Sequence, residues 1–172
     1  MNIILCGFMG CGKTTIGKQL KKLTGYKLID MDLAIQKEFG MMISEFFEKF
    51  GEKKFRETET ETLKQLLDKD NQIIATGGGV VVNRLNVDLI NSYDNAILVY
   101  IDTPLRALQE RLKNDTKRPL LQRPDRYEFI ATLHNSRHPI YKQAAKITVS
   151  GGAPINFVAK NIKKLVFSLD KV

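Results

Sequence analysis

The chain has 172 residues, enough for one domain with a sizeable core, and its 43% hydrophobic and 27% charged content is ordinary for a soluble globular protein. No apolar run approaches the roughly 20 residues of a membrane span, and the first residues lack the basic segment of a signal peptide. The formal net charge of +8 suits nucleic acid or small polyanions, and the scattered lysines, without interleaved aromatic residues, favour small polyanions. We therefore expect a cytoplasmic protein with neither a membrane nor a nucleic acid as its partner.

The beginning of the chain predicts a phosphate-binding loop. Residues 2–6 form an apolar run typical of a strand buried on both faces, and residues 13–24 have helical spacing. Between them, residues 7–14 (GFMGCGKT) fit the pattern G-x-x-x-x-G-K-[ST] at every fixed position. Glycines let backbone N–H groups turn toward phosphate oxygens, and the helix N-terminus adds further donors. Lys13 would reach the β- and γ-phosphates of a nucleotide, and the Thr14 hydroxyl would bind Mg²⁺.

The rest of the chain alternates between apolar runs and helical patterns. Four further strands are expected, at residues 26–30, 72–76, 96–101 and 146–149. Helices are expected from about residue 33, at 44–50 with Ser44 as N-cap, and then at 53–67, 83–91, 105–112, 127–145 and from 155 onward. Pro139 should bend or restart the helix at 127–145, and residues 114–126 read as an exposed loop. This alternation predicts a five-stranded parallel sheet covered on both faces by helices.

Residues suited to phosphoryl transfer follow several of the predicted strands. Asp30 and Asp32 come after the second strand, three glycines at 77–79 follow the third, and residues 150–152 follow the fifth. Because the carboxyl ends of parallel strands share one edge of the sheet, these groups should meet the phosphate loop there. Phosphoryl transfer needs Mg²⁺ near the β- and γ-phosphates and a group that orients or deprotonates the attacking hydroxyl. Asp30 is the better candidate for the metal side, and Asp32 is the better base.

Several other residues have two interpretations. Asp102 ends an apolar strand as the metal-binding acid of motor-type ATPases does, but no glutamate follows it, which favours a helix-capping role. The triple glycine either lets a ligand approach the backbone closely and meet its N–H groups, or is a flexible turn. Arg56 could be a surface residue paired with Glu59, and Arg118 could close over the phosphates. Arg137 is ambiguous on its own, although guanidinium groups suit carboxylate and phosphate recognition.

Six segments together resemble, in order and rough spacing, those of the shikimate kinases. The phosphate loop is shared by many kinases, whereas the combination of Asp-x-Asp, Phe-Arg-x-x-Glu and triple glycine is more specific. The segments are GFMGCGKT at 7–14, IDMD at 29–32, GE at 51–52 with FRETE at 55–59, ATGGG at 75–79, RPLL at 118–121 and RHPIY at 137–141. The resemblance covers almost the whole chain, from Ile4 to Pro154.

The resemblance implies a fold and an activity. The expected fold is a P-loop three-layer α/β/α architecture of the nucleoside-monophosphate-kinase type, with strand order 2-3-1-4-5. The family also implies a single kinase domain over residues 1–172, with a substrate-binding segment near 32–60 and a lid near 112–124. The implied activity is the ATP- and Mg²⁺-dependent phosphorylation of the 3-hydroxyl of shikimate. We expect the enzyme to act as a monomer.

The resemblance also implies roles for individual residues. Asp32, Lys13 and Arg118 are expected to be catalytic, and Thr14 and Asp30 to support the metal. The residues expected to bind ATP are Gly10, Cys11, Gly12, Lys13, Thr14, Thr15, Arg111, Arg118 and Pro154. The residues expected to bind shikimate are Asp32, Arg56, Gly77, Gly78, Gly79 and Arg137, with the two arginines on its carboxylate. Arg111 and Pro154 would lie on the adenine side.

Three other functions compete with this interpretation. A gluconate or nucleotide kinase would share the phosphate loop and lid, but Phe55-Arg56 together with the triple glycine argues against it. A GTP-binding switch needs the base-reading motif Asn-Lys-x-Asp, which the sequence does not contain. An ATPase associated with nucleic acid would hydrolyse ATP faster when DNA or RNA is added, whereas a shikimate kinase should respond to neither.

Overall fold

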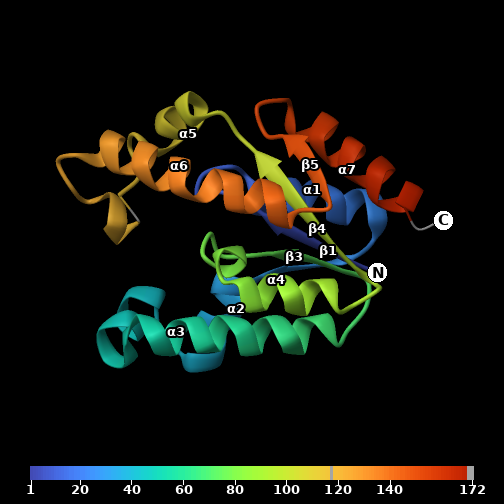
Figure 1. Cartoon of the computed structure of the whole chain (residues 1–172), viewed down its shortest axis with the longest axis horizontal. Coiled ribbons are helices and arrows are strands. Elements are labelled where there is room, and N and C mark those ends of the chain that lie inside the picture. The colour runs from blue at the N-terminus through green and yellow to red at the C-terminus, as the bar shows by residue number, and fades with distance from the viewer. Residues whose placement is uncertain (117, 170–172) are drawn as a thin grey trace.

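The computed structural model describes residues 1–116 and 118–169 and contains one parallel five-stranded sheet (Figure 1). The strand order is β2-β3-β1-β4-β5, which confirms the expected order. The strands are β1 (Asn2–Cys6), β2 (Lys27–Asp30), β3 (Gln72–Ala75), β4 (Ala96–Asp102) and β5 (Ile147–Ser150). All five residues of the central strand β1 are buried, as the short apolar run predicts for a strand covered on both faces.

Seven α-helices and two short 3₁₀ helices connect the strands in the described part of the chain. The α-helices are α1 (Lys13–Thr24), α2 (Met31–Phe39), α3 (Ile43–Leu67), α4 (Arg84–Asn91), α5 (Leu105–Leu112), α6 (Arg126–Ala144) and α7 (Ile155–Leu169). The 3₁₀ helices are η1 (Val80–Val82) and η2 (Pro119–Leu121). Within the residues described here, none of the helices is both long and apolar enough to cross a membrane.

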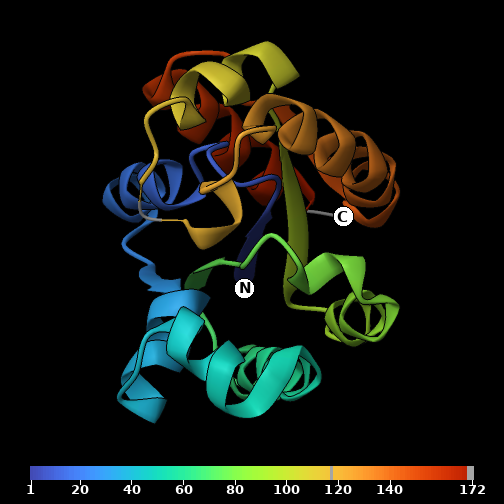
Figure 2. The same cartoon turned by 90° about the vertical axis from the view of Figure 1, so that its left-hand side faces the viewer.

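The strand register places the ends of neighbouring strands, and the loops that follow them, at one edge of the sheet. Leu5 near the end of β1 lies opposite Ala75 of β3 and Val99 of β4, so the segments that leave these strands begin side by side. Figure 2 looks at this carboxyl edge, where the described residues between α5 and α6 (yellow to orange) cross in front of the strands. Helices α2 and α3 (light blue to cyan) lie below them in the same view. The edge therefore gathers segments that are far apart in the sequence.

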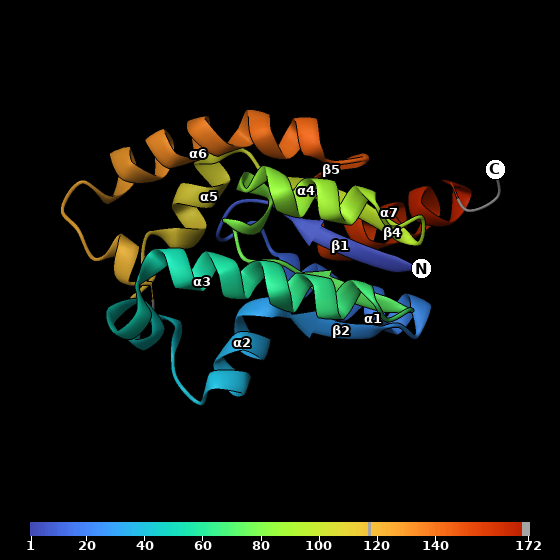
Figure 3. The same ribbon diagram turned by 60° about the horizontal axis from the view of Figure 1, so that its bottom comes forward.

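Helices cover both faces of the sheet, as the three-layer expectation requires. Figure 3 shows α3, α4 and α6 on the near side of the strands, with α1 and α7 behind them. Gly17 lets α1 approach the sheet closely, because a Cβ there would lie 2.7 Å from Leu28 Cδ1. A second, smaller core joins α2 and α3 through Ile35, Phe46 and Phe55, all nearly inaccessible to solvent. This small core holds α2 and the first part of α3 together.

Two helices differ from the expectation. The expected N-cap at Ser44 is wrong, because α3 begins at Ile43 and the N–H of Met42 donates to the Glu45 carboxylate at 2.6 Å. At Gly51 the backbone leaves the helical conformation, with φ of 78° and ψ of 168°, so residues 43–67 are two helical segments joined at a kink, which confirms the expected interruption there. Helix α6 runs as a single helix through Pro139, which rules out the restart that was expected there as the alternative to a bend. Tertiary packing of α6 on β4 and η1 outweighs the local penalty of the proline.

Candidate active site

The loop between β1 and α1 has the conformation that its glycines predict. Gly7, Gly10 and Gly12 have φ of 143°, 78° and 98°, a region that glycine enters without strain. A Cβ on Gly7 would lie 2.9 Å from Cys11 Sγ, so the loop is also too tight for a side chain at that position. Gly12 precedes α1 without a side-chain cap, which leaves the first N–H groups of the helix available. The loop and the helix start therefore offer a cluster of donors suited to phosphate oxygens.

Lys13 lies across this loop. Its ammonium nitrogen donates to the carbonyl of Gly7 at 2.8 Å and to that of Phe8 at 3.1 Å. These bonds fold a long, flexible side chain back over the loop that it follows. The positive charge is consequently held beside the N–H donors, where the β- and γ-phosphates of a nucleotide would lie.

Thr14 and Asp30 bring two oxygen atoms together from the ends of neighbouring elements. The Thr14 hydroxyl donates to Asp30 Oδ2 at 2.9 Å. The other oxygen of Asp30 accepts from the N–H of Leu33 at 3.4 Å and caps α2, which fixes the carboxylate. Hydroxyl and carboxylate oxygens are ligands that Mg²⁺ prefers, and it usually takes few of them because phosphates and water complete its shell. The residues present fit a magnesium ion held mainly by the nucleotide.

Asp32 lies in the first turn of α2, where charges from four elements surround it. Its carboxylate is open to solvent on one side, but the protein around it reduces its hydration. This loss of hydration and the Asp30 carboxylate raise the pKa of Asp32, while Lys13, Arg56 and Arg118 act in the opposite direction. A carboxylate with a raised pKa beside a phosphate loop suits a group that accepts a proton during the reaction.

Arg56 of α3 is held by two glutamates. Its guanidinium lies 2.6 Å from Glu59 and 3.0 Å from Glu52. The pair with Glu59 has the expected i,i+3 spacing, but Glu59 is only 2% exposed, so this is not a surface pair. Burial raises the pKa of Glu59, and although burial lowers the pKa of Arg56, its bonds to both glutamates more than compensate and raise it. Arg56 therefore keeps its charge and a fixed orientation.

The triple glycine after β3 is the meeting point of the site's side chains. Gly77, Gly78 and Gly79 have ordinary φ values, so their conformation does not require glycine. Space does limit two of them, because a Cβ on Gly77 or Gly79 would lie too close to a polar side chain of the site, whereas one on Gly78 would make ordinary contacts. The contacts would be Asp32 and Glu59 at Gly77 (both 2.9 Å), Arg137 at Gly78 (3.5 Å) and Arg56 at Gly79. The loop is therefore a surface on which a carboxylate and two arginines converge.

A pocket of about 250 Å³ adjoins the phosphate loop on its other side, at the start of α7. The Arg111 guanidinium donates to the carbonyls of Gly10 (3.2 Å), Cys11 (3.4 Å) and Gly151 (3.1 Å), and thus ties the loop to the turn after β5. Pro154 is not among the lining residues, although its neighbours are. The lining residues are Gly10, Cys11, Gly12, Thr15, Ile16, Arg111, Gly151, Ala153 and Ile155.

The segment between α5 and α6 carries Arg118. Its guanidinium forms an ion pair with Asp115 of the same segment. Its charge also acts on Asp32, where it opposes the rise in the pKa of that carboxyl group. The expected exposed loop is anchored, because Leu121 within it is completely buried. Arg126 at the start of α6 donates to the carbonyls of Leu121 (2.7 Å) and Leu112 (3.4 Å), which fixes both ends of the segment.

The expectation that Asp102 caps a helix is wrong. Helix α5 begins after Pro104 with no side-chain hydrogen bond to its N-terminus. Instead, Asp102 accepts from the Tyr100 hydroxyl at 3.2 Å and lies 3.4 Å from His138 Nε2 on α6. The ring of His138 lies 5.4 Å from that of the buried His134, so both histidines belong to the packing of α6 on β4.

Two contributors to the site were missed in the sequence. Glu59 was seen only as a partner of Arg56, although its spacing from Phe55 and Leu63 puts it on the buried stripe of α3, which is a detectable signal. No role was predicted for Tyr141, the last residue of the segment RHPIY at 137–141, yet its hydroxyl donates to the carbonyl of Gly78 at 2.6 Å. Tyr141 lies four residues after Arg137, so both side chains share one face of α6. This spacing is a signal that the sequence alone provides.

The strand order, with the phosphate loop directly after the central β1, is that of a P-loop kinase of the nucleoside-monophosphate-kinase type. Two arginines and a carboxylate beside that loop suit a small anionic alcohol as the acceptor. The family profile described as shikimate kinase matches residues 9–166. The chain belongs to the shikimate kinase family.

Individual relatives agree with this assignment over most of their length. The chain is 46% identical to the shikimate kinase of Caldicellulosiruptor bescii over 82% of this chain and 81% of the relative. It is 40% identical to that of Thermodesulfovibrio yellowstonii over 95% and 93% of the two chains. The solved shikimate kinase of Acinetobacter baumannii, in complex with shikimate, superposes with a TM-score of 0.89 at 34% identity and covers 97% of this chain and 93% of its own.

Proposed function

We propose that the residues at the carboxyl edge of the sheet form three parts of a shikimate kinase active site: a nucleotide site, a metal site and an acceptor site. The reaction is the transfer of the γ-phosphoryl group of ATP to the 3-hydroxyl of shikimate, in the shikimate pathway that leads to chorismate and the aromatic amino acids. The observation that carries this proposal is the position of Asp32. Its carboxylate lies against Gly77 of the triple glycine, and the charges of both Lys13 and Arg56 act on its pKa.

For the nucleotide, we assign the phosphates to the backbone of residues 10–15 and to Lys13. The glycine conformations and the position of the ammonium group support this assignment. The base then occupies the pocket beside Arg111, with Pro154 on the outer side of its rim. Thr14 and Asp30 would hold Mg²⁺, which would supply neutralisation of the charge that develops on the phosphates during the transfer.

For the acceptor, we assign the carboxylate of shikimate to Arg56 and Arg137, and a ring hydroxyl to the backbone of the triple glycine. Both arginines lie against that loop, and Glu59 keeps Arg56 oriented. A guanidinium group binds a carboxylate through two parallel hydrogen bonds, which fixes the ring in position as well as in charge. Because Gly77 and Gly79 have no Cβ, they leave room for the Asp32 and Arg56 side chains beside the loop.

In the chemical step, Asp32 accepts the proton of the 3-hydroxyl while the hydroxyl oxygen attacks the γ-phosphorus and the bond to ADP breaks. Lys13 and Arg118 stabilise the charge that develops on the transferred group. Arg118 supports this role from its segment, because its charge already reaches Asp32. Exclusion of water by that segment would limit wasteful hydrolysis of ATP.

The same proposal covers the organisation of the chain. Residues 1–172 form one kinase domain, in which residues 32–60 bind the acceptor and residues 112–124 form the lid. The assigned groups of one chain make up the whole proposed site, without a residue from a second copy. We infer a monomer that works in the cytoplasm on small molecules, without nucleic acid. The lid assignment rests on Arg118 and on the two ends that Arg126 fixes.

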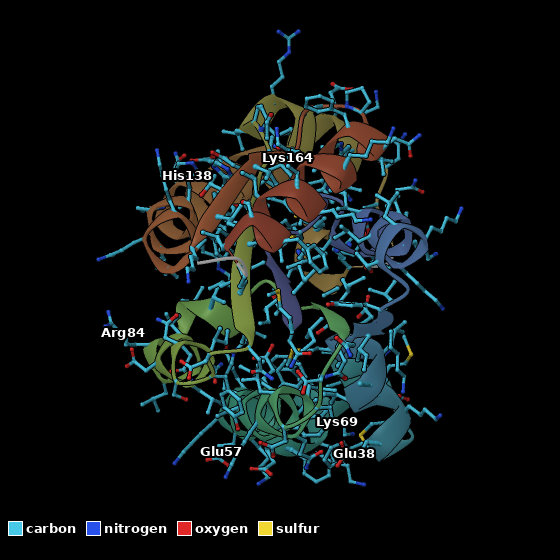
Figure 4. All side chains as sticks on the ribbon, turned by 90° about the vertical axis from the view of Figure 1, so that its right-hand side faces the viewer. Glu38, Glu57, Lys69, Arg84, His138 and Lys164 are labelled. Atoms are coloured by element: carbon cyan, nitrogen blue, oxygen red, sulfur yellow. The ribbon has the colours of Figure 1, made fainter. Side chains whose placement is uncertain are left out.

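Replacement of Asp32 tests the proposal. In a coupled assay with MgATP and shikimate, Asp32→Asn should lower kcat about a hundredfold to ten-thousandfold, the range for loss of a general base. The matched control is Asp88→Asn, an exposed carboxylate of α4 paired at 2.9 Å with Arg84, which Figure 4 places on the outer surface. The control should keep kcat within about twofold, since exposed ion pairs contribute little. Near-normal turnover of Asp32→Asn would reject the role given to Asp32.

A further inference from the structure

Tyr141 connects helix α6 to the triple-glycine loop. It is completely buried, and its hydroxyl donates to the carbonyl of Gly78 at 2.6 Å, across 63 residues of sequence. This short bond ends on the middle glycine, at the point where the loop faces the two arginines. A buried carbonyl that loses its partner is costly, so the bond fixes the orientation of this peptide.

The same hydroxyl lies against Arg137, one helical turn earlier on α6. Burial raises the pKa of Tyr141 to about 12, and the adjacent Arg137 guanidinium opposes that rise. The hydroxyl therefore keeps its proton at neutral pH and remains a donor. A Cβ on Gly78 would lie 3.5 Å from Arg137 Nη1 and 3.7 Å from Tyr141 Oη, so both side chains close around this one residue.

The ring of Tyr141 is in turn fixed by β4. It packs 5.3 Å from the ring of Tyr100, whose hydroxyl donates to Asp102 at 3.2 Å. Asp102 also meets His138, which lies on α6 next to Arg137 and is labelled in Figure 4. The Tyr141 ring is thus held by the ring of Tyr100, which does not depend on the Tyr100 hydroxyl, while the contact of Asp102 with His138 holds α6 at a second position.

We propose that Tyr141 is a positioning residue for the acceptor: its hydroxyl sets the Gly78 peptide and the Arg137 guanidinium in the geometry that receives the acceptor's carboxylate and hydroxyl. The proposal rests on the acceptor roles given above to Gly78 and Arg137. Without the hydroxyl, the Gly78 carbonyl lacks its partner and Arg137 loses a neighbour, so acceptor binding weakens. The nucleotide site is built from other elements and should not respond.

The variant Tyr141→Phe removes only the hydroxyl and keeps the buried ring. Its KM for shikimate should rise about tenfold, as expected when one hydrogen bond is lost and a buried carbonyl is left without a partner. The KM for MgATP and kcat should stay within about twofold. Tyr100→Phe is the matched control, because it removes a buried tyrosine hydroxyl that bonds Asp102 instead of the glycine loop. It should leave the KM for shikimate within about twofold.

A double-mutant cycle with Arg137→Lys tests the connection to the arginine. If Tyr141 acts through Arg137, then Tyr141→Phe should raise the KM for shikimate less in the Arg137→Lys background than in the wild type. Additive effects, an equal rise in both KM values, or a rise no larger than in Tyr100→Phe would each overturn the proposal.

Hydrogen exchange of the ligand-free protein separates this proposal from the assigned function. The N–H groups of Val80 and Val82 bond the carbonyls of Gly77 and Gly79, so their exchange reports on the order of the loop. Exchange there should be faster in Tyr141→Phe than in the wild type and unchanged in Tyr100→Phe. If exchange is faster in Tyr141→Phe but the wild type does not phosphorylate shikimate, the link between Tyr141 and the glycine loop is supported and shikimate is rejected as the acceptor. Unchanged exchange would overturn the connection, whatever the acceptor.

Discussion

The two glycine loops of this molecule look alike in the sequence but need glycine for different physical reasons. In the phosphate loop, Gly10 and Gly12 have positive φ, so the requirement comes from the backbone itself. In the loop at residues 77–79 the φ values are ordinary, and the requirement at Gly77 and Gly79 comes from side chains of α2 and α3 that a Cβ would approach too closely. The first requirement is local, whereas the second exists only after distant helices have packed.

This difference explains what each loop can do. A loop whose backbone turns its N–H groups inward offers the same cradle to any triphosphate, which is why its motif is shared by many kinases. A loop that packs against Asp32, Arg56 and Arg137 sets the spacing of these side chains, and in the proposed function that spacing selects the acceptor. Generic phosphate binding and specific acceptor binding thus use one residue type in two ways. Substitutions by alanine should separate them.

The largest effect is expected from Gly79→Ala. A Cβ there collides with the Arg56 guanidinium, the flexible end of a side chain, so the fold should survive while the arginine moves. Loss of a charge-assisted pair with the substrate carboxylate should lower kcat/KM for shikimate about a hundredfold. The KM for MgATP should change little. Steady-state kinetics with each substrate varied in turn measures both values.

The control for that substitution is Gly152→Ala. A Cβ on Gly152 would meet nothing closer than 3.6 Å, so the residue has room for a methyl group. Both kinetic constants should remain within about twofold, because surface substitutions away from special features change little. If Gly79→Ala were as active as this control, side-chain crowding would not be the reason for the glycine.

Gly12→Ala should produce the next largest effect, on the other substrate. Space is available, since only Ile16 Cδ1 lies within 4 Å at 3.8 Å, but φ of 98° is unfavourable for alanine. Strain of about 1–3 kcal/mol corresponds to a rise of about tenfold to a hundredfold in the KM for MgATP. Binding of shikimate alone, measured by calorimetry, should be unaffected. A selective loss of shikimate binding would contradict the backbone argument.

Local patterns in the sequence were sufficient for the parts of the molecule whose cause is local. The bounds of β1 and α1 were predicted to the residue, because a buried apolar run, a glycine loop and a helical stripe each have a signature within a few residues. The strand order came from the family resemblance, since single strands do not reveal which neighbours they pair with. The same resemblance supplied the acceptor and most of the assigned roles.

What escaped prediction depends on contacts between distant segments. Asp102 was interpreted from its place before a helix, but its partners are a tyrosine on its own strand and a histidine on α6. Pro139 was expected to bend or restart α6, and the helix does not restart there, because packing on β4 keeps it a single helix. Arg126 fixes both ends of the segment between α5 and α6 through backbone carbonyls, and no sequence pattern reveals which carbonyls those will be.

Glu59→Gln should have a smaller effect than either alanine substitution. Glutamine retains the volume and one acceptor oxygen but not the charge that holds Arg56, so the KM for shikimate should rise about tenfold. The control is Glu57→Gln, an exposed residue on the outer side of α3 (Figure 4) that pairs with Lys54 at 3.3 Å. It should change the KM by less than about twofold. A lower KM in Glu59→Gln would mean that Glu59 competes with the substrate for Arg56.

The smallest expected effect is a displacement along the pH axis, and it connects the two loops through Asp32. Reduced hydration and the neighbouring Asp30 raise the pKa of Asp32 above its ordinary value near 3.8. Asp32 must be ionised to accept a proton, so kcat/KM for shikimate at saturating MgATP should begin to fall at a higher pH than an ordinary aspartate would cause. A pH–rate profile measures this, with circular dichroism at each pH to show that the protein remains folded.

Stability should change with pH in the opposite direction. A carboxyl group whose pKa is higher in the folded state binds its proton more tightly there, so its contribution to the free energy of unfolding is greatest below the unfolded pKa. That contribution is lost as pH rises through the folded pKa, over the same window in which activity appears. Denaturant unfolding of the wild type and Asp32→Asn should therefore diverge as pH rises through this window, with the wild type losing more. If the free energies of unfolding of the two proteins changed with pH in parallel, Asp32 would be hydrated like a surface carboxylate. A raised pKa would then no longer support its role as proton acceptor.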